Sequence, residues 1–255
     1  MPDDVPPGRR PSDDQARMYK GLKIVLIAPV LDEEVKIGEV VRRAPREIVD
    51  EVLVVDDGSK DRSPEVARAG GATVLPMGAT VGVGAALRAG FVWAKERGFD
   101  VIVVIAGNNK DAPEEIPRLL DPIVAGADFV QGSRFLAGGR TGGMPLYRHV
   151  ATRLHPLLFS LTSGKRVSES TNGFRAFRTT LLDDPRIRLH QSWLDEYELE
   201  PYLYWKTIRL GYRTAEVPVT KIYPPKAIGY TKMKPITGWW SMLRPLVLLG
   251  LRLRG

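Results

Sequence analysis

The sequence is marked first by the residue types it lacks. Its 255 residues include no cysteine, which excludes disulfide bonds and thiolate metal sites. Only three histidines are present, and none stands in a recognisable catalytic motif. No apolar stretch reaches the roughly 20 residues that a membrane span needs. The first 20 residues have no apolar core, so they do not resemble a signal peptide, and their Pro, Asp and Arg content predicts a disordered leader.

An excess of basic side chains points to anionic partners. The formal net charge is +7, which favours nucleotides, phosphorylated lipids, anionic membrane surfaces or nucleic acid. No zinc-finger or aromatic RNA-binding motif supports nucleic acid. We therefore expect a nucleoside diphosphate or a lipid phosphate as partner, and no nucleic acid.

Two apolar runs that end in acids organise the chain. The run at 52–55 leads into Asp56, Asp57 and Gly58, and an earlier run at 24–30 also ends in acidic residues. Ligands of open α/β sheets bind just outside the carboxyl ends of the strands. We expect Asp56 and Asp57 to face one shared polar site, with Gly58 allowing a sharp turn. An ordinary Asp-Gly turn is the alternative.

The remaining pattern alternates strands with helices. We expect further strands over 72–75, 100–105, 128–131 and 214–222, and helices over 35–43, 63–69, 81–97, 113–124, 145–161 and 195–210. This alternation predicts an α/β fold with a doubly wound, mainly parallel sheet flanked by helices. Gly82 and Gly84 permit a close backbone approach, either to a ligand or to the sheet.

The strand ends resemble those of the family-2 glycosyltransferases, which bind nucleotide sugars in a GT-A fold. That family has Pro-x-x-Asn-Glu after its first strand, where this chain has Asp32 in place of Asn. The family's Val-Asp-Asp-Gly-Ser-x-Asp is matched in full at 55–61. The later half is most similar to polyprenyl-phosphate (dolichyl-phosphate) sugar transferases. The resemblance implies a nucleotide-sugar site that includes Pro29, Leu31, Glu33, Asp56, Asp57, Gly58, Gly107 and Asn108.

The chain departs from this family at its metal motif. GT-A enzymes generally hold Mg²⁺ or Mn²⁺ with an Asp-x-Asp after the central strand, and Ala106, Gly107 and Asn108 occupy those positions. Lys110 and Asp111 follow. In one interpretation Asn108 and Asp111 hold a weaker metal site. In a second, Lys110 itself supplies the positive charge. In a third, the site is catalytically silent and only binds.

A second set of motifs implies an acceptor site. Arg134 ends a Gly-Ser-Arg that matches the family, Arg148 lies in a segment resembling the one with a second arginine, and Thr152 takes the place of a serine. In polyprenyl-phosphate transferases these residues hold the lipid phosphate, and guanidinium groups suit that role because they bind phosphate bidentately. The alternative for Arg148 is a solvated position on a helix.

Two further motifs complete the expected catalytic set. Glu169 opens a segment that resembles Asp-x-x-Ser/Asn-Gly-Phe-Arg, with Glu in the Asp position. A phosphate acceptor needs no general base, whereas a hydroxyl acceptor would need one, with Glu169 or Glu198 as candidates. The segment at 223–232 resembles a basic loop of the family, which implies a lid over the diphosphate formed by Lys226, Thr231 and Lys232.

The end of the chain is predicted to form an amphipathic helical tail. Trp239 and Trp240 join a Leu/Val run that also carries Arg244. Tryptophan favours the headgroup level of a membrane and arginine favours anionic lipid, so we expect peripheral membrane contact without a span. Pro245 is expected to break the run. The alternative is a helix packed on the protein's own core.

These features predict three parts: a disordered leader at 1–20, a GT-A-like glycosyltransferase domain at 21–233, and the tail at 234–255. The resemblance implies an enzyme that moves a sugar from a nucleoside-diphosphate sugar to a polyprenyl phosphate or similar lipid-linked acceptor, with inversion. It would act in the cytoplasm, at the inner face of the cell membrane. A soluble hydroxyl acceptor and a catalytically silent nucleotide-sugar-binding protein are the alternatives.

Overall fold

A computed structural model describes residues 19–224 and 237–251. Almost all of the predicted leader lies outside these ranges. The predicted lid residues Lys226, Thr231 and Lys232 also lie outside the described residues, so their assignment stays a prediction.

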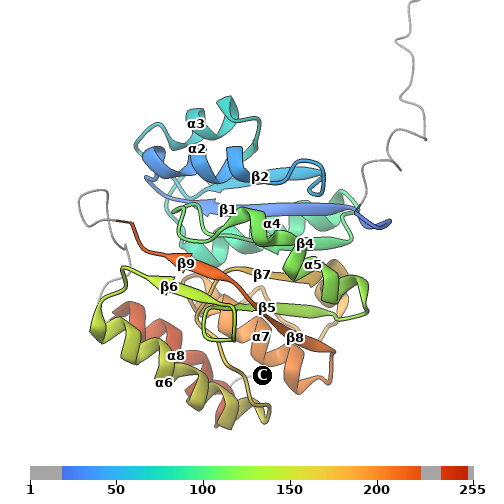
Figure 1. The fold of residues 1–255 in the computed structure, drawn as a ribbon, viewed down its shortest axis with the longest axis vertical. Coiled ribbons are helices and arrows are strands. Elements are labelled where there is room, and N and C mark those ends of the chain that lie inside the picture. Colours follow the sequence, from blue (N-terminus) through green and yellow to red (C-terminus); the bar gives the residue numbers. More distant parts are fainter. Residues whose placement is uncertain (1–18, 225–236, 252–255) are drawn as a thin grey trace, which may run out of the picture.

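One seven-stranded sheet forms the centre of the molecule (Figure 1). Its strands, in spatial order, are β3 (Thr73–Pro76), β2 (Glu51–Asp56), β1 (Ile24–Val30), β4 (Val101–Val104), β7 (Arg175–Arg178), β5 (Phe129–Ser133) and β8 (Thr214–Pro218). Only β7 runs antiparallel to its neighbours, β4 and β5. Nearly every residue of β1 and β4 is buried, as parallel strands covered on both faces require. The expected mainly parallel α/β sheet is confirmed.

Helices cover both faces of this sheet and enclose two apolar cores. On one face lie α2 (Glu34–Arg43), α3 (Ser63–Ala69) and α5 (Ile116–Val124). On the other lie α4 (Val83–Glu96) and α7 (Leu199–Arg209). Short 3₁₀ turns occupy Pro113–Glu115, Thr179–Asp183 and Ser192–Leu194. The helix expected over 195–210 therefore begins only at Leu199.

A smaller, two-stranded sheet and two further helices complete the fold. The strands β6 (Arg140–Gly142) and β9 (Thr220–Ile222) pair in parallel. The single strand expected over 214–222 is thus two strands, because Pro218 has no N–H to continue the ladder and the chain passes to the second sheet. The helices α6 (Leu146–Ser163) and α8 (Thr237–Gly250) lie side by side (Figure 1).

The expected break at Pro245 does not occur, because α8 continues through it. A proline inside a helix removes one backbone hydrogen bond, and tertiary packing can offset that loss. Leu246 and Leu249 anchor α8 in the main core. A side chain at Gly250 would meet Thr162 of α6 at 2.8 Å, which shows how closely the two helices pack. Within the described residues, no helix is long and apolar enough to span a membrane.

Candidate active site

A cavity of about 570 Å³ lies at the carboxyl ends of β1, β2 and β4. This is where ligands of open α/β sheets bind. Segments from α6, α7, β9 and α8 close its other side. Many of the residues predicted from the sequence line it, namely Pro29, Leu31, Glu33, Asp57, Gly107, Asn108, Lys110 and Arg148.

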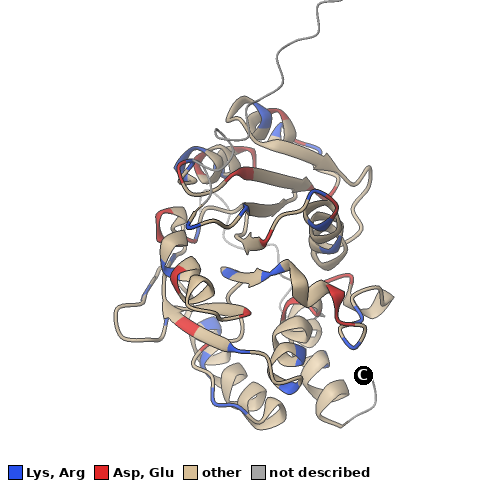
Figure 2. Cartoon of the chain, turned by 90° about the vertical axis from the view of Figure 1, so that its right-hand side faces the viewer, with Lys and Arg blue, Asp and Glu red and all other residues tan. Residues whose placement is uncertain are grey.

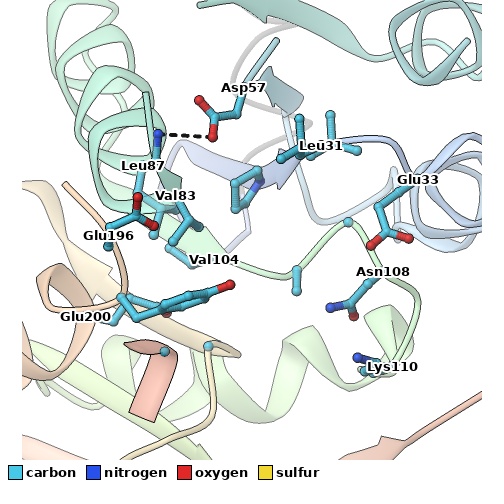
Figure 3. A pocket seen from close by; sticks show the side chains of 18 of the residues that line it. Leu31, Glu33, Asp57, Val83, Leu87, Val104, Asn108, Lys110, Glu196 and Glu200 are labelled. Atoms are coloured by element: carbon cyan, nitrogen blue, oxygen red, sulfur yellow. Dashed lines mark hydrogen bonds between the residues drawn. The ribbon is translucent and has the colours of Figure 1, made fainter. Parts of the chain in front are cut away.

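The two neighbouring aspartates after β2 have different surroundings. The Asp57 carboxylate accepts hydrogen bonds from the backbone N–H groups of Val81 and Gly82, at 2.8 and 3.2 Å, and lines the cavity (Figure 3). Burial raises the pKa of Asp57 above its ordinary value, although these two N–H groups favour its charged form. Asp56 does not line the cavity, and its carboxylate accepts the Ser59 N–H at 3.0 Å.

The expectation that both aspartates face the site therefore needs correction. Side chains of successive residues in an extended segment point to opposite sides, so only one of the two aspartates faces the cavity. Gly58, as expected, adopts a left-handed conformation with φ +79°. A side chain there would meet the backbone of Ala79 and Thr80 at 2.7 Å, so this turn requires glycine.

The loop after β4 carries the altered metal motif. Asn108 lines the cavity, and among the described residues its side-chain oxygen has no hydrogen-bond partner although it is buried. In Figure 3 the Glu33 side chain lies on the same side of the cavity as Asn108 and Lys110. Glu33 forms a 2.6 Å ion pair with Lys36. The positions of the two missing acids thus hold Ala106 and the amide Asn108, and Lys36 and Lys110 line the same cavity.

Lys110 is a buried cation at the floor of the cavity. Its side chain lies over the Tyr223 ring, 4.8 Å from the centroid, and the residue is 7% exposed. Burial, together with the positive charges of Lys221 and Arg148, lowers the pKa of Lys110 to about 7. A negatively charged ligand would favour the charged form of Lys110, because its charge offsets both the burial and the neighbouring positive charges.

Asp111 serves the structure of this loop. Both of its carboxylate oxygens accept hydrogen bonds from Lys221, at 2.7 Å each, and Asn172 accepts a third from the same ammonium at 3.0 Å. The backbone N–H of Ile222 also donates to the Lys110 carbonyl at 2.8 Å. The loop is therefore fastened to β9, and Asp111 does not line the cavity.

The charges around Asn108 do not suit a divalent cation. In the described parts of the chain, no group of three or more His, Asp or Glu side chains gathers as metal ligands would. Mg²⁺ and Mn²⁺ favour carboxylate and phosphate oxygens, whereas Asn108 offers a neutral amide and Lys110 and Lys221 line the same cavity. The residues present do not fit the proposed metal pair of Asn108 and Asp111, since Lys221 engages Asp111.

The residues predicted to bind the acceptor also fall into two groups, those that line the cavity and those that do not. Arg134 is 3% exposed, and its guanidinium donates to Glu169 at 2.6 Å and to Thr171 at 3.1 Å. Burial of Arg134 opposes its charge, yet the Glu169 carboxylate raises its pKa above the ordinary value. Thr152 donates to the carbonyl of Arg148 at 2.8 Å. Neither Arg134, Glu169 nor Thr152 lines the cavity.

Arg148 is the predicted acceptor residue that reaches the cavity. It projects from the first turns of α6, with its guanidinium 5.6 Å from the Tyr223 ring centroid. Lys110 lies over the same ring. Two cations, Lys110 and Arg148, thus lie over one tyrosine ring, and Lys221 of β9 lines the same cavity.

Several lining residues were missed from the sequence, namely Lys36, Thr171, Glu196, Tyr197 and Lys221. Lys221 could have been found, because it lies within a predicted strand, where lysine is depleted. Glu196 and Tyr197 reach the site because the start of α4 packs on the backbone of residues 194–196. A side chain at Gly84 would meet the Leu194 carbonyl at 2.1 Å, so the partner of the glycine pair is this segment and not the sheet.

Comparisons with known proteins agree with this architecture. The family model of Glycosyl transferase family 2 matches residues 25–184. The chain belongs to this family. Polyprenol monophosphomannose synthase of Mycolicibacterium smegmatis is 32% identical over 237 residues, covering 89% of this chain and 88% of that protein. Undecaprenyl-phosphate mannosyltransferase of Micrococcus luteus is 34% identical, covering 72% and 75%. The protein is therefore a glycosyltransferase.

Solved structures place the fold among GT-A-like enzymes. Glucosyl-3-phosphoglycerate synthase of Mycobacterium tuberculosis, in complex with Mn²⁺, UDP and glucosyl-3-phosphoglycerate, superposes with a TM-score of 0.63 at 22% identity. The match covers 98% of this chain and 86% of that one. The same enzyme with Mg²⁺ and UDP gives a TM-score of 0.64 at 23% identity, covering 95% and 85%. At this identity the likeness concerns the fold.

Proposed function

We propose that this glycosyltransferase moves a sugar from a nucleoside-diphosphate sugar to a polyprenyl phosphate, with inversion at the anomeric carbon. The observation that carries the proposal is the division of the cavity. Asp57 lies at the strand edge, while Lys110, Lys221 and Arg148 line the same cavity. Such a site matches a donor with a neutral nucleoside end and a charged diphosphate end, next to a second phosphate.

The acceptor class is supported by the relatives. Their names state a polyprenol phosphate product or an undecaprenyl-phosphate acceptor, and the sequence similarity covers most of this chain. Both substrates would be anionic where they meet, which suits the part of the cavity that Lys110 and Arg148 line. A membrane-embedded acceptor also suits our expectation that the enzyme works in the cytoplasm, at the inner face of the cell membrane.

In the proposed reaction an oxygen of the acceptor phosphate attacks the anomeric carbon. A new carbon–oxygen bond forms as the bond to the donor diphosphate breaks, and the nucleoside diphosphate leaves with the electron pair. No proton needs to move, because the acceptor is already an anion. The chain must therefore position two anions and stabilise the charge that builds on the leaving group.

We assign these tasks to three side chains. Asp57 holds the nucleoside through its carboxylate, which its two backbone hydrogen bonds fix in place. Lys110, charged once the donor is bound, faces the leaving diphosphate and stabilises the negative charge that develops on it. Arg148 binds the acceptor phosphate, because a guanidinium offers two parallel N–H groups to it. In this proposal Lys110 supplies the positive charge for which the family generally uses a metal ion.

The soluble-acceptor alternative makes a different demand on the site. A hydroxyl acceptor requires a base, and Glu169 is engaged by Arg134. Glu198 is 4% exposed and does not line the cavity. Glu200 does line the cavity, and it lies 3.3 Å from the Arg175 guanidinium. Glu200 and Glu196, which also lines the cavity, are therefore the base candidates that this alternative would use.

One assay distinguishes the possibilities. Purified protein is incubated with a panel of radiolabelled sugar nucleotides and a short-chain polyprenyl phosphate in detergent, and the product is extracted into organic solvent. Label in the organic phase, in the β configuration from an α-linked donor by NMR, supports the proposal. Label transferred only to a water-soluble hydroxyl compound supports the alternative. Donor binding without any turnover marks a silent binding protein.

A further inference from the structure

The helix α6 exposes an apolar stripe along its whole outer side. Leu146, Leu157 and Leu161 are 78%, 67% and 80% exposed. The stripe continues at three- and four-residue spacing, which places its members on one side of a helix. It consists of Leu146, Tyr147, Val150, Leu154, Leu157, Leu158 and Leu161. The opposite side of α6 is buried in the protein through Thr152, His155, Phe159 and Ser163.

The neighbouring helix extends this surface. Trp240 and Val247 of α8 and the adjoining Leu251 are exposed, at 56%, 37% and 66%. Their spacing again puts them on one side, while Leu246 and Leu249 of the same helix enter the core. We name the α6 stripe together with these three residues the α6–α8 face. An exposed apolar surface of this extent marks an interaction site.

The charges around this face indicate what covers it. No Asp or Glu occurs anywhere from Leu136 to Ser168, whereas the segment carries the cations Arg140, Arg153, Lys165 and Arg166 besides Arg148 at the cavity. The α8 sequence has no acid either. In Figure 2 the lowest part of the molecule, where α6 and α8 lie in Figure 1, shows tan ribbon with blue positions. Apolar side chains among cations complement an anionic bilayer.

A second copy of the chain suits this surface less well. Two copies meeting through the α6–α8 face would bring their basic residues together without acids to neutralise them, and like charges oppose such contact. An anionic lipid surface offers the missing negative charge and accepts apolar side chains. Trp240 adds a residue type that favours the headgroup level.

The same two helices also line the cavity from its other side. Arg148 comes from the start of α6, and Gly238, Ser241 and Met242 come from α8. A surface that seats these helices on lipid thus holds the cavity next to the headgroups. This last step rests on the proposed function, because an acceptor in the membrane gives a reason for the cavity to lie next to the headgroups.

We propose that the α6–α8 face seats the protein on an anionic membrane surface, with α6 as its main contact. The sequence-based expectation placed this contact in the C-terminal tail alone. The structure shows that most of the exposed apolar residues belong to α6, more than 70 positions earlier in the chain. The contact is peripheral, because the apolar residues form one side of each helix and the other side is packed on the protein.

Flotation of full-length protein with lipid vesicles tests this proposal. Vesicles of phosphatidylcholine with phosphatidylglycerol should carry the protein, and vesicles of phosphatidylcholine alone should carry at least tenfold less. The double variant Leu157→Gln/Leu161→Gln should lose at least tenfold in binding to anionic vesicles. Arg153→Gln, an exposed cation on α6, should lose a smaller factor, and only at low salt.

A matched control replaces exposed apolar residues elsewhere. Val92 and Val124 lie on α4 and α5 and are 39% and 38% exposed. The variant Val92→Gln/Val124→Gln should float like the wild type. Circular dichroism confirms that each variant is folded. If the double leucine variant does not fold, Leu146→Gln, at the 78% exposed start of α6, provides a milder test and should lose at least threefold.

The outcomes separate this proposal from the proposed function. Leu157→Gln/Leu161→Gln should transfer sugar normally to a short-chain acceptor in detergent and lose activity only toward acceptor in vesicles. Arg148→Lys should lose transfer and still float. Equal flotation of wild type and face variants, or equal loss in the valine control, overturns the membrane assignment. A dimer that dissociates in the leucine variant would overturn it as well, by giving the face to a second copy.

Discussion

The two halves of the cavity are held in different ways. On the side that we propose for the donor, Asp57 is fixed by the backbone N–H groups of Val81 and Gly82, and it lines the cavity. On the side that we propose for the acceptor, Arg134 and Glu169 form an ion pair inside the protein, and Arg148 extends into the cavity. The proposed donor side thus presents its carboxylate directly, whereas the proposed acceptor side also contains a buried ion pair.

This contrast assigns different consequences to similar residues. A charge that faces the cavity should matter for binding and turnover, and one that is buried against a partner should matter for stability. Arg134 and Arg148 are both arginines in motifs of one family, yet the first is 3% exposed and paired.

The largest effect is expected for the buried pair. Glu169→Ala leaves the Arg134 guanidinium buried without its carboxylate, so the free energy of unfolding should fall by about 3–5 kcal/mol. Urea denaturation measures this change. Replacing both residues by methionine should cost less than the single change, because no lone charge remains. A Glu169→Ala variant that keeps its stability and loses only acceptor binding would return Arg134 to the phosphate site.

The next largest effect concerns Lys110. If it stabilises the leaving diphosphate, Lys110→Ala should lower kcat about 10²–10³-fold, as removal of one such donor does elsewhere. Chelation of divalent ions should change kcat of the wild type by much less. Lys206→Ala is the control, since that lysine does not line the cavity. Full loss of activity on chelation, with Lys110→Ala unimpaired, would assign the charge to a metal ion.

A smaller effect distinguishes the two aspartates. Asp57→Ala should weaken binding of the matching nucleoside diphosphate at least tenfold, about 1.4 kcal/mol, by calorimetry. Asp56→Ala should leave that affinity within about twofold, since its carboxylate serves the Ser59 N–H inside the turn. Equal losses for both would mean that the turn as a whole holds the nucleotide.

The smallest expected effect is the uptake of a proton when the diphosphate binds. Because the pKa of Lys110 is about 7, this side chain is mostly neutral at pH 8 in the empty site. A bound diphosphate favours the charged form and raises this pKa, so binding at pH 8 should take up a proton. At pH 6 the lysine is already charged and uptake should vanish. Calorimetry in buffers of different ionisation enthalpy measures it, and Lys110→Ala should show none at either pH.

The parts of the molecule that could be predicted from sequence are those with local causes. The strand ends at Val30 and Asp56 follow from apolar runs that stop at acids, and parallel strands bring such ends to one edge. The sheet and the place of the cavity could therefore be predicted. Lys221 could not be paired with Asp111 from sequence, because their contact joins residues 110 positions apart.

Other features depend on tertiary packing in the same way. Pro245 was expected to break its helix, but α8 packs against α6 and α7, and it contacts α6 both before Pro245, at Met242, and after it, at Gly250. Whether an arginine in a family motif faces the ligand depends on its neighbours in three dimensions. Only the folded chain shows that Arg134 meets Glu169 inside the protein, whereas Arg148 lines the cavity.

The link between the loop after β4 and β9 affects how the motif can be altered by design. Asp111 and Lys221 form a buried pair, and Ile222 bonds to the carbonyl of Lys110. Aspartates introduced at Ala106 and Asn108 would meet these lysines before they met a metal ion. Restoring the acids one at a time should therefore create internal ion pairs, and manganese affinity should rise only after Lys110 is replaced as well. The order of substitutions, and not only their final set, would decide whether a functional metal site can be reached.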